Sequence, residues 1–278
     1  MYIDLHLHSK HSDGNWTVGQ IVSHAAQIGL SAIAITDHDS VSGLPEAIEL
    51  CATAYDVELV AGVEINTVWS NLDVHVLGYF IDDKSDALSD LFARQVGARH
   101  AQAAQILHRL KVQGYRIPDH LADLSLLSYP AAPGKVHMAN AISAITGLDV
   151  MQAYHLYLKR SGSHYVERAS VSPLEAVQAI RMAGGIASIA HSGPLLQESP
   201  ADFDELLQAT IKAGLRAIEV FHPQHDEALR RSLRDAARQY GLLETGGSDC
   251  HGPYEDHPSM MGTQSVPRDL LEKLASAI

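Results

Sequence analysis

The stretch YIDLHLHSKHSDG, residues 2–14, alternates apolar and polar side chains and then enters a polar loop. This alternation predicts a β-strand over residues 2–8, in which successive side chains point to opposite faces. His6 and His8 are two residues apart, so both point to the same face. Asp13 follows in the loop, at the mouth of a barrel if the strand belongs to one. The stretch therefore predicts two histidines and a carboxylate close to one end of a strand.

The same short apolar runs recur along the chain, and amphipathic stretches separate most of them. Further strands are expected at residues 32–36, 58–65, 74–80, 186–190, 217–221 and 242–246. Helices are expected at residues 18–29, 44–55, 173–183, 202–213 and 227–240. The linker at residues 67–73 is short, so the fourth strand is expected to run antiparallel to the third. The alternation predicts an α/β fold, either an open sheet or a barrel.

Residues 82–168 interrupt this alternation. They contain a long helical pattern at residues 88–113 and shorter ones at 135–146 and 150–160, with no convincing strand. We therefore expect residues 1–81 and 169–278 to form the barrel and residues 82–168 to form a helical insertion. The insertion is either a packing element or a lid that contributes to a substrate site.

Composition excludes several classes of protein. The 278 residues are 46% hydrophobic and 19% charged, which supports a large core. No apolar run approaches the roughly 18 residues of a membrane span, and no secretory signal pattern opens the chain. Two cysteines are too few for a disulfide framework. The net charge of −13 disfavours binding to long nucleic acid. We expect a cytoplasmic protein, whose oligomeric state the sequence does not indicate.

Nearly every predicted strand ends in a histidine or a carboxylate, and the chain has 17 histidines in all. In barrel enzymes the carboxyl ends of the strands form the active-site face. One such residue would be an ordinary surface group, but the set predicts a metal site. Nitrogen and oxygen donors without thiolate suit zinc, manganese or iron. The residues concerned are His6, His8, Asp13, His38, Asp39, Glu64, His75, His191, Glu219, His222, His225, Asp249 and His251.

The chain resembles the PHP (polymerase and histidinol phosphatase) phosphoesterases of the amidohydrolase superfamily. The resemblance rests on DLHLHSKHSDG, ITDHDS, GVEI, HVLGY, IAHSG, IEVFHP and GGSDCH, which follow the order of the family motifs. It implies a distorted (β/α)7 barrel of the TIM type, with two to three divalent metal ions. Manganese is expected, with zinc or iron as alternatives, because Asp13 stands where some members have histidine.

The resemblance also implies how the ligands are shared among the ions. His6, His8, Glu64 and Asp249 would hold the first metal. Asp13, His38 and His251 would hold the second. Glu64 would bridge to a third, held by His75 and His191.

Two segments resemble a bacterial subgroup that acts on nucleotide phosphates. They are GKVHMANAI at residues 134–142, which departs from the subgroup at Lys135, Val136 and Asn140, and YLKRSGSHYV at residues 157–166. The nearest resemblance is to nucleoside 3′,5′-bisphosphate phosphatases. It implies a phosphoric monoester hydrolase that releases the 3′-phosphate and leaves the 5′-nucleotide. The candidate substrate-binding residues are Ser9, Lys135, Asn140 and Arg160.

The expected chemistry is attack on phosphorus by a hydroxide that bridges two metals. Glu64 and Asp249 would act as catalytic carboxylates. His222 would be either the general acid or a hydrogen-bond partner of a carboxylate.

Alternative functions stay open. They are a 5′-3′ exonuclease on short oligonucleotides, a histidinol-phosphate phosphatase, an amidohydrolase that cuts C–N bonds, and a non-enzymatic PHP scaffold. The motif TDHDS argues against the C–N hydrolase. The complete set of family positions argues against the scaffold, because degenerate domains lose ligands.

Overall fold

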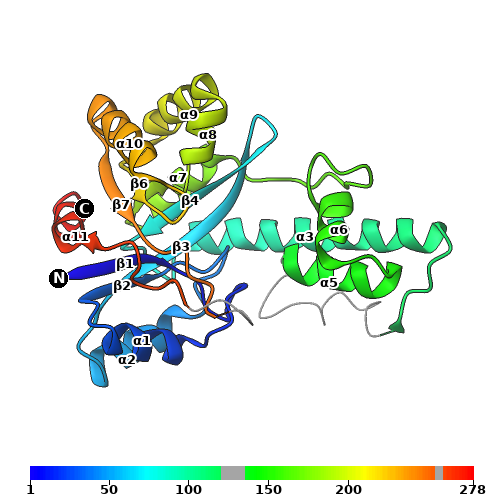
Figure 1. Ribbon diagram of the computed structural model, residues 1–278, viewed down its shortest axis with the longest axis horizontal. Coiled ribbons are helices and arrows are strands. Elements are labelled where there is room, and N and C mark those ends of the chain that lie inside the picture. Colours follow the sequence, from blue (N-terminus) through cyan, green and yellow to red (C-terminus); the bar gives the residue numbers. More distant parts are fainter. Residues whose placement is uncertain (120–134, 254–258) are drawn as a thin grey trace. The chain divides into compact units, whose positions relative to one another are not determined.

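The computed structural model describes residues 1–119, 135–253 and 259–278 (Figure 1). The chain divides into two compact units. The barrel unit comprises Met1–Leu91 and Val171–Ile278, and the helical unit comprises Phe92–Ser170. The idea that the helical segment contributes to a substrate site stays a prediction.

One eight-stranded sheet, in the order β7-β6-β5-β4-β3-β2-β1-β8, forms the barrel unit (Figure 1). Its strands are β1 (Tyr2–Leu7), β2 (Ala32–Ile35), β3 (Glu58–Trp69), β4 (Leu72–Tyr79), β5 (Ile186–Ile189), β6 (Ala217–Phe221), β7 (Leu243–Gly246) and β8 (Val266–Pro267). Strands β1–β3 are parallel to one another, as are β5–β7. Strand β4 runs antiparallel to β3 and to β5, which confirms the expected hairpin.

The sheet is curved into a nearly closed barrel. A parallel bridge joins Leu7, at the end of β1, to Cys250, beyond the end of β7. The N–H of His8 donates to the carbonyl of Cys250 at 3.0 Å. Strand β8, which the sequence did not predict, pairs antiparallel with the same edge of β1, through Tyr2 and Ile3, while β2 pairs with the opposite edge. The two ends of the sheet therefore meet at β1, the strand that carries the paired histidines.

Both faces of β1 are buried, which explains its sequence. Ile3 and Leu5 pack in an apolar cluster with helix α11 (Arg268–Ala275). Asp4, His6 and His8 alternate with them and are at most 1% exposed. Because alternate residues face opposite ways, the strand delivers one apolar face to the core and one polar face to the site.

Helices of the barrel unit begin and end at the residues that local chemistry favours. They are α1 (Val18–Gln27), α2 (Leu44–Thr53), α7 (Pro173–Met182), α8 (Gly193–Glu198), α9 (Pro200–Ala213), α10 (Glu227–Tyr240) and α11. Thr17 and Ser172 form capping boxes at the starts of α1 and α7. Gly241 ends α10 with a φ of 67°, a conformation that glycine adopts without steric cost. Capping thus fixes the starts of α1 and α7 and the end of α10.

The helical unit has its own apolar core. It contains most of α3 (Asp86–Val112), with α5 (Lys135–Thr146), α6 (Val150–Ala153) and the π-helical turn η2 (Tyr154–Leu158). Ile106, Leu110, Ile142 and Tyr157 are buried together in it. This segment therefore buries apolar surface of its own.

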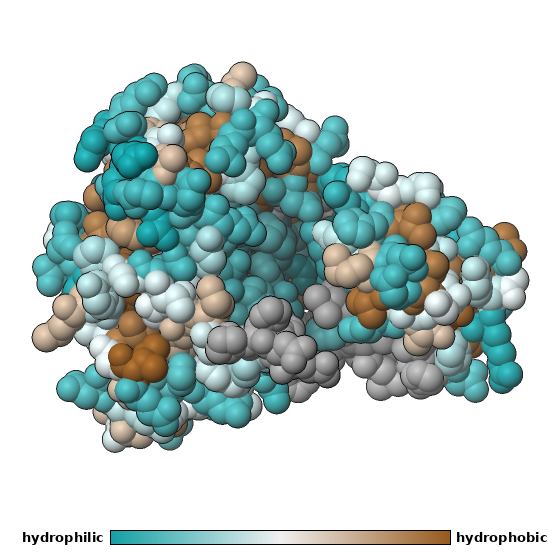
Figure 2. Space-filling model, in the orientation of Figure 1, coloured by the Kyte–Doolittle hydropathy of each residue, from teal (hydrophilic) through white to brown (hydrophobic). Residues whose placement is uncertain are grey.

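Among the described residues, no helix is both long and apolar enough to cross a bilayer. The face of the molecule in Figure 2 is mostly hydrophilic, with hydrophobic residues in separate patches. The expected cytoplasmic location stays a prediction.

Gly247, just beyond β7, lies so close to β1 that a side chain there would clash with it. A Cβ atom there would lie 2.4 Å from the backbone nitrogen of His6 and 2.8 Å from Asp4 Oδ1. We expect Gly247→Ala to lower the free energy of unfolding by about 1–3 kcal/mol, because the clash with the His6 backbone can be relieved only by moving β1. Urea denaturation measures this change. The control is Gly97→Ala, at an exposed helical position with nothing within 4 Å of the added atom. It should stabilise the protein by about 0.5–1 kcal/mol. Equal stabilities of the two variants would contradict the packing argument.

Candidate metal centre

The residues that the sequence singled out as metal ligands all lie in the barrel unit, at or near the ends of strands. His6 lies in β1, and Glu64 and His75 lie on the paired strands β3 and β4. The others follow strands: His8 and Asp13 come after β1, His38 after β2, His191 after β5, and Asp249 and His251 after β7. The fold therefore brings residues that are far apart in sequence to one edge of the sheet.

Glu64 is the centre of this arrangement and is only 1% exposed. Its Oε2 lies near nitrogens of His6 (3.3 Å), His8 (3.2 Å) and His38 (3.1 Å). Its Oε1 lies near nitrogens of His75 (3.0 Å) and His191 (3.1 Å). The two oxygens thus face two different sets of histidines.

Among the residues that the structure describes, three overlapping groups have ligand atoms within 4.8 Å of one another. They are His6, His8, Glu64 and Asp249; His8, Asp13, His38 and His251; and His38, Glu64 and His75. The first is the set that the family resemblance implied. The second adds His8 to the implied set. In the third, His38 stands in the group and His191 does not, although His191 Nε2 contacts Glu64 Oε1.

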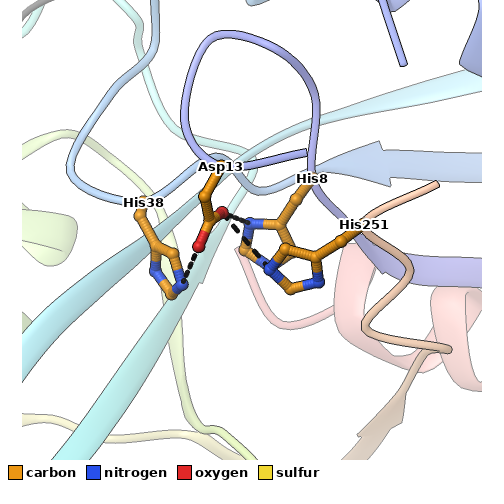
Figure 3. Close-up of side chains that lie close together, drawn as sticks. All are labelled: His8, Asp13, His38 and His251. Atoms are coloured by element: carbon orange, nitrogen blue, oxygen red, sulfur yellow. Dashed lines mark ion pairs between the residues drawn. The ribbon is translucent and has the colours of Figure 1, made fainter. Parts of the chain in front are cut away.

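Asp13 joins the second group (Figure 3). Its Oδ1 lies 3.2 Å from His251 Nε2 and 3.9 Å from His8 Nδ1, and its Oδ2 lies 3.8 Å from His38 Nε2. One loop carboxylate therefore faces histidines from three separate segments.

Buried polar atoms without hydrogen-bond partners indicate that these groups fit metal ions. A buried polar atom left without a partner costs about 1–3 kcal/mol, so such atoms are rare unless they bind something. Coordination would satisfy them, and nitrogen with carboxylate oxygen suits Mn²⁺, Fe²⁺ or Zn²⁺. The atoms in these groups are His6 Nε2, both ring nitrogens of His8, Asp13 Oδ1, His38 Nδ1 and Glu64 Oε2.

The electrostatics of the centre are dominated by burial and by close opposite charges. Burial alone would raise the pKa of Glu64, but His38 and His6 hold it well below its usual range. Burial would lower the pKa of His8, but Asp249 and Glu64 outweigh it and raise that pKa to about 10. For His38 burial prevails, so its pKa falls to about 4. The carboxylates are ionised at neutral pH.

Strained backbone accompanies these ligands. Asp39, His191 and Asp249 have φ values of 48°, 26° and 50°, which cost about 1–3 kcal/mol each in non-glycine residues. Asp39 accepts hydrogen bonds from the backbone and side-chain N–H groups of Asn66, both at 3.0 Å. Its own N–H donates to the carbonyl of Glu64. Asp39 therefore ties the loop that carries His38 to β3.

Sequence reasoning missed Asp4. Its carboxylate accepts hydrogen bonds from the backbone N–H groups of Ser248 at 2.9 Å and Gly262 at 2.8 Å. It thereby holds the loop before Asp249 against β1. The two-residue spacing of Asp4, His6 and His8 places all three on one face of the strand, and this spacing could have identified Asp4 from the sequence. Glu219, noted at a strand end but given no role, contacts His6 Nδ1 at 2.9 Å.

His222 contacts the candidate ligand Asp249. Its Nδ1 accepts a hydrogen bond from the N–H of Gln224 at 3.2 Å, so the ring proton sits on Nε2. That Nε2–H lies 3.3 Å from Asp249 Oδ2. This geometry favours the interpretation that His222 supports a carboxylate. Its role as a general acid stays a prediction.

The candidate substrate-binding residues are divided between the two units. Ser9 is buried in the barrel unit, where its hydroxyl donates to Asp37 at 2.7 Å and accepts from the N–H of His11. Its one hydroxyl hydrogen is therefore engaged, and a contact of Ser9 with substrate stays a prediction.

The other three residues lie in the helical unit. Lys135 begins α5, and Asn140 is exposed on the same helix. Arg160 pairs with Glu167 at 2.7 Å and lies over the ring of Tyr165. Substrate binding by these residues also stays a prediction.

Comparison with known proteins identifies the class. Residues 4–167 match the PHP domain, and the chain belongs to this family of metal-dependent phosphoesterases. The family predicted from the motifs is thus confirmed, and the protein is a hydrolase of phosphate esters.

Three relatives show how the family varies. The chain is 32% identical to the phosphoribosyl 1,2-cyclic phosphate 1,2-diphosphodiesterase of Eggerthella lenta, over 91% of this chain and 95% of that protein. It is 32% identical to a 5′-3′ exoribonuclease of Salmonella typhimurium, over 90% and 85%. It is 29% identical to the 3′,5′-nucleoside bisphosphate phosphatase of Chromobacterium violaceum, over 95% and 92%.

A solved structure agrees with these relatives. It is described as a metal-dependent phosphoesterase from Bifidobacterium adolescentis and superposes with a TM-score of 0.82 at 28% identity, covering 99% of this chain and 95% of that one. This chain shares the fold with that structure, whereas the substrates named for the three relatives differ.

The raised pKa values predict that metal uptake releases protons. Nearby carboxylates outweigh burial and raise the pKa of His6 well above its ordinary value and that of His8 to about 10. In the metal-free protein both side chains are therefore imidazolium ions at pH 7, and a metal ion must displace the proton of the ring nitrogen that it binds. We expect Mn²⁺ affinity to rise between roughly pH 6 and pH 9. Titration calorimetry in two buffers of different protonation enthalpy measures the released protons. A binding enthalpy that does not depend on the buffer would contradict this expectation.

Proposed function

We propose that this protein hydrolyses nucleoside 3′,5′-bisphosphates to 5′-nucleotides, using two to three divalent ions of which Mn²⁺ is favoured. The observation that carries the metal part is the position of Glu64, whose two oxygens contact different histidines in overlapping ligand groups. The barrel would be the distorted (β/α)7 type of the family, with residues 82–168 as its helical insertion.

The ligands divide among the ions as the groups overlap. His6, His8, Glu64 and Asp249 would hold one ion. Asp13, His38 and His251 would hold a second, with His8 Nδ1 available to it. Glu64, His75 and His191 would hold a third. When bound, such ions supply a water of lowered pKa and positive charge beside the phosphoryl group.

The residues of the chain prepare the site for that chemistry. His222 holds its proton at Nε2 and offers it to Asp249 Oδ2. That contact leaves Asp249 Oδ1 turned toward His6 at 3.4 Å and His8 at 3.2 Å. Because the network fixes the carboxylate before substrate arrives, little reorganisation is needed during the reaction.

The substrate assignment rests on a second anion site that we propose in the helical unit. Residues 92–170 contain nine Lys or Arg against four Asp or Glu, in a chain of net charge −13. Lys135, at the start of a helix, and Arg160 would hold the 5′-phosphate while the 3′-phosphate reaches the metals. A relative at 29% identity is named for this activity.

A second candidate is 5′-3′ exonuclease action on short RNA, because a relative at 32% identity carries that name. A phosphate-release and product screen separates the candidates. Its substrates are adenosine 3′,5′-bisphosphate, a short 5′-phosphorylated RNA, a ribose 1,2-cyclic phosphate and histidinol phosphate. Highest kcat/KM on the bisphosphate supports the proposal, and highest kcat/KM on any other substrate replaces it.

Glu64 should be the most damaging ligand to lose. Glu64→Ala removes both carboxylate oxygens, which face five histidines, whereas His191→Ala removes one contact, the one with Glu64 Oε1. We expect Glu64→Ala to reduce turnover by well over the roughly 10–100-fold seen when only a supporting group is lost. It should also lower bound metal by more than one ion per chain. Elemental analysis of both variants and the parent, purified without chelator, gives the metal content. Less than one ion per chain in a fully active parent would rule out the metal assignment.

The two-phosphate assignment makes a separate prediction. Charge-assisted contacts are worth about 1.5–3 kcal/mol, so Lys135→Ala and Arg160→Ala should each lower kcat/KM on the bisphosphate roughly ten- to a hundredfold. An aryl phosphate lacks the second anion and should be spared. Lys159→Ala, which removes an exposed neighbouring cation, is the control. Equal losses on both substrates would show that Lys135 and Arg160 do not hold a second phosphate.

A further inference from the structure

We infer that Glu219, on β6, is a positioning residue that fixes which nitrogen of His6 faces the metal centre and holds the backbone of His191. Glu219 is fully buried. Its Oε1 lies 2.9 Å from His6 Nδ1, and its Oε2 accepts the backbone N–H of His191 at 2.7 Å. Within the described residues Glu219 belongs to none of the three ligand groups, so it acts through its neighbours.

The contact with His6 decides a tautomer. Glu219 accepts the backbone N–H of His191 through Oε2, and its other carboxylate oxygen, Oε1, likewise accepts and faces His6 Nδ1. His6 Nδ1 must therefore carry the hydrogen in this bond. The other nitrogen, Nε2, faces Glu64 Oε2 at 3.3 Å and Asp249 Oδ1 at 3.4 Å. Glu219 thus leaves Nε2 as the nitrogen that gives up its proton when a metal ion binds, and this inference rests on the metal part of the proposed function.

The contact with His191 holds its backbone rather than its ring. The φ of His191 is 26°, a region that non-glycine residues adopt only under constraint. Its N–H points to Glu219, while its Nε2 reaches Glu64 Oε1 at 3.1 Å. A single buried carboxylate on β6 thus sets side chains from β1 and from the end of β5, although β6 itself contributes no ligand.

Glu219→Gln tests the inference with little change of shape. The amide can accept through only one of its two terminal atoms, so it loses either the bond from His6 or the bond from His191. We expect the tightest Mn²⁺ site to weaken by roughly 10–100-fold in titration calorimetry. We also expect kcat to return toward the parent value at saturating Mn²⁺, with KM for substrate unchanged. Glu244→Gln is the matched control, since this carboxylate on neighbouring β7 contacts Arg234 instead.

The parent protein provides a test that needs no variant. In Zn²⁺-loaded protein with ¹⁵N-labelled histidine, NMR should show His6 bound to zinc through Nε2 and protonated at Nδ1. Binding through Nδ1, or unchanged Mn²⁺ affinity in a folded Glu219→Gln variant, would overturn the role of Glu219 and leave the proposed function intact. A parent protein that binds no metal would instead overturn both.

Discussion

The structure depends on keeping one ionised carboxylate, Glu64, buried among five imidazoles. Removing a carboxylate from water is costly, and the contacts with these histidines, including the positively charged His6 and His8, compensate for it. Those histidines come from four other segments of the barrel, so the compensation exists only when the sheet is nearly closed. The electrostatic stabilisation of Glu64 therefore depends on the closure of the barrel.

The strand topology brings these histidines to Glu64. The antiparallel hairpin of β3 and β4 pairs Asn66 with His75, which places His75 beside Glu64 without a crossover helix. Buried groups then tie the loops to the strands: Asp4 holds the loop before Asp249, Asp39 holds the loop that carries His38, and Glu219 contacts His6 and His191. Strained residues at the strand ends are tolerated because these bonds fix them.

We propose that the two units have different roles, with metal binding in the barrel unit and substrate binding in the helical unit. The barrel unit holds the candidate ligands, which need ångström-scale precision, and builds them on strands and their immediate ends. The helical unit carries an excess of cations and a separate core. Under that proposal, substitutions in the helical unit would change the substrate preference without altering the candidate ligands. The relatives named above carry different substrate names at similar identity.

The sequence by itself determined the α/β class, the seven main strands and the candidate ligands, because strand periodicity and strand-end placement are local properties of the chain. His6 and His8 could be paired from their spacing alone. The grouping of His38 with Glu64 and His75, the contact of His222 with Asp249, and the roles of Asp4 and Glu219 required the tertiary structure. Those relations depend on which strands curve toward each other and on how each ring turns. Neither is encoded at short range, because both result from the closure of the sheet around a buried charge.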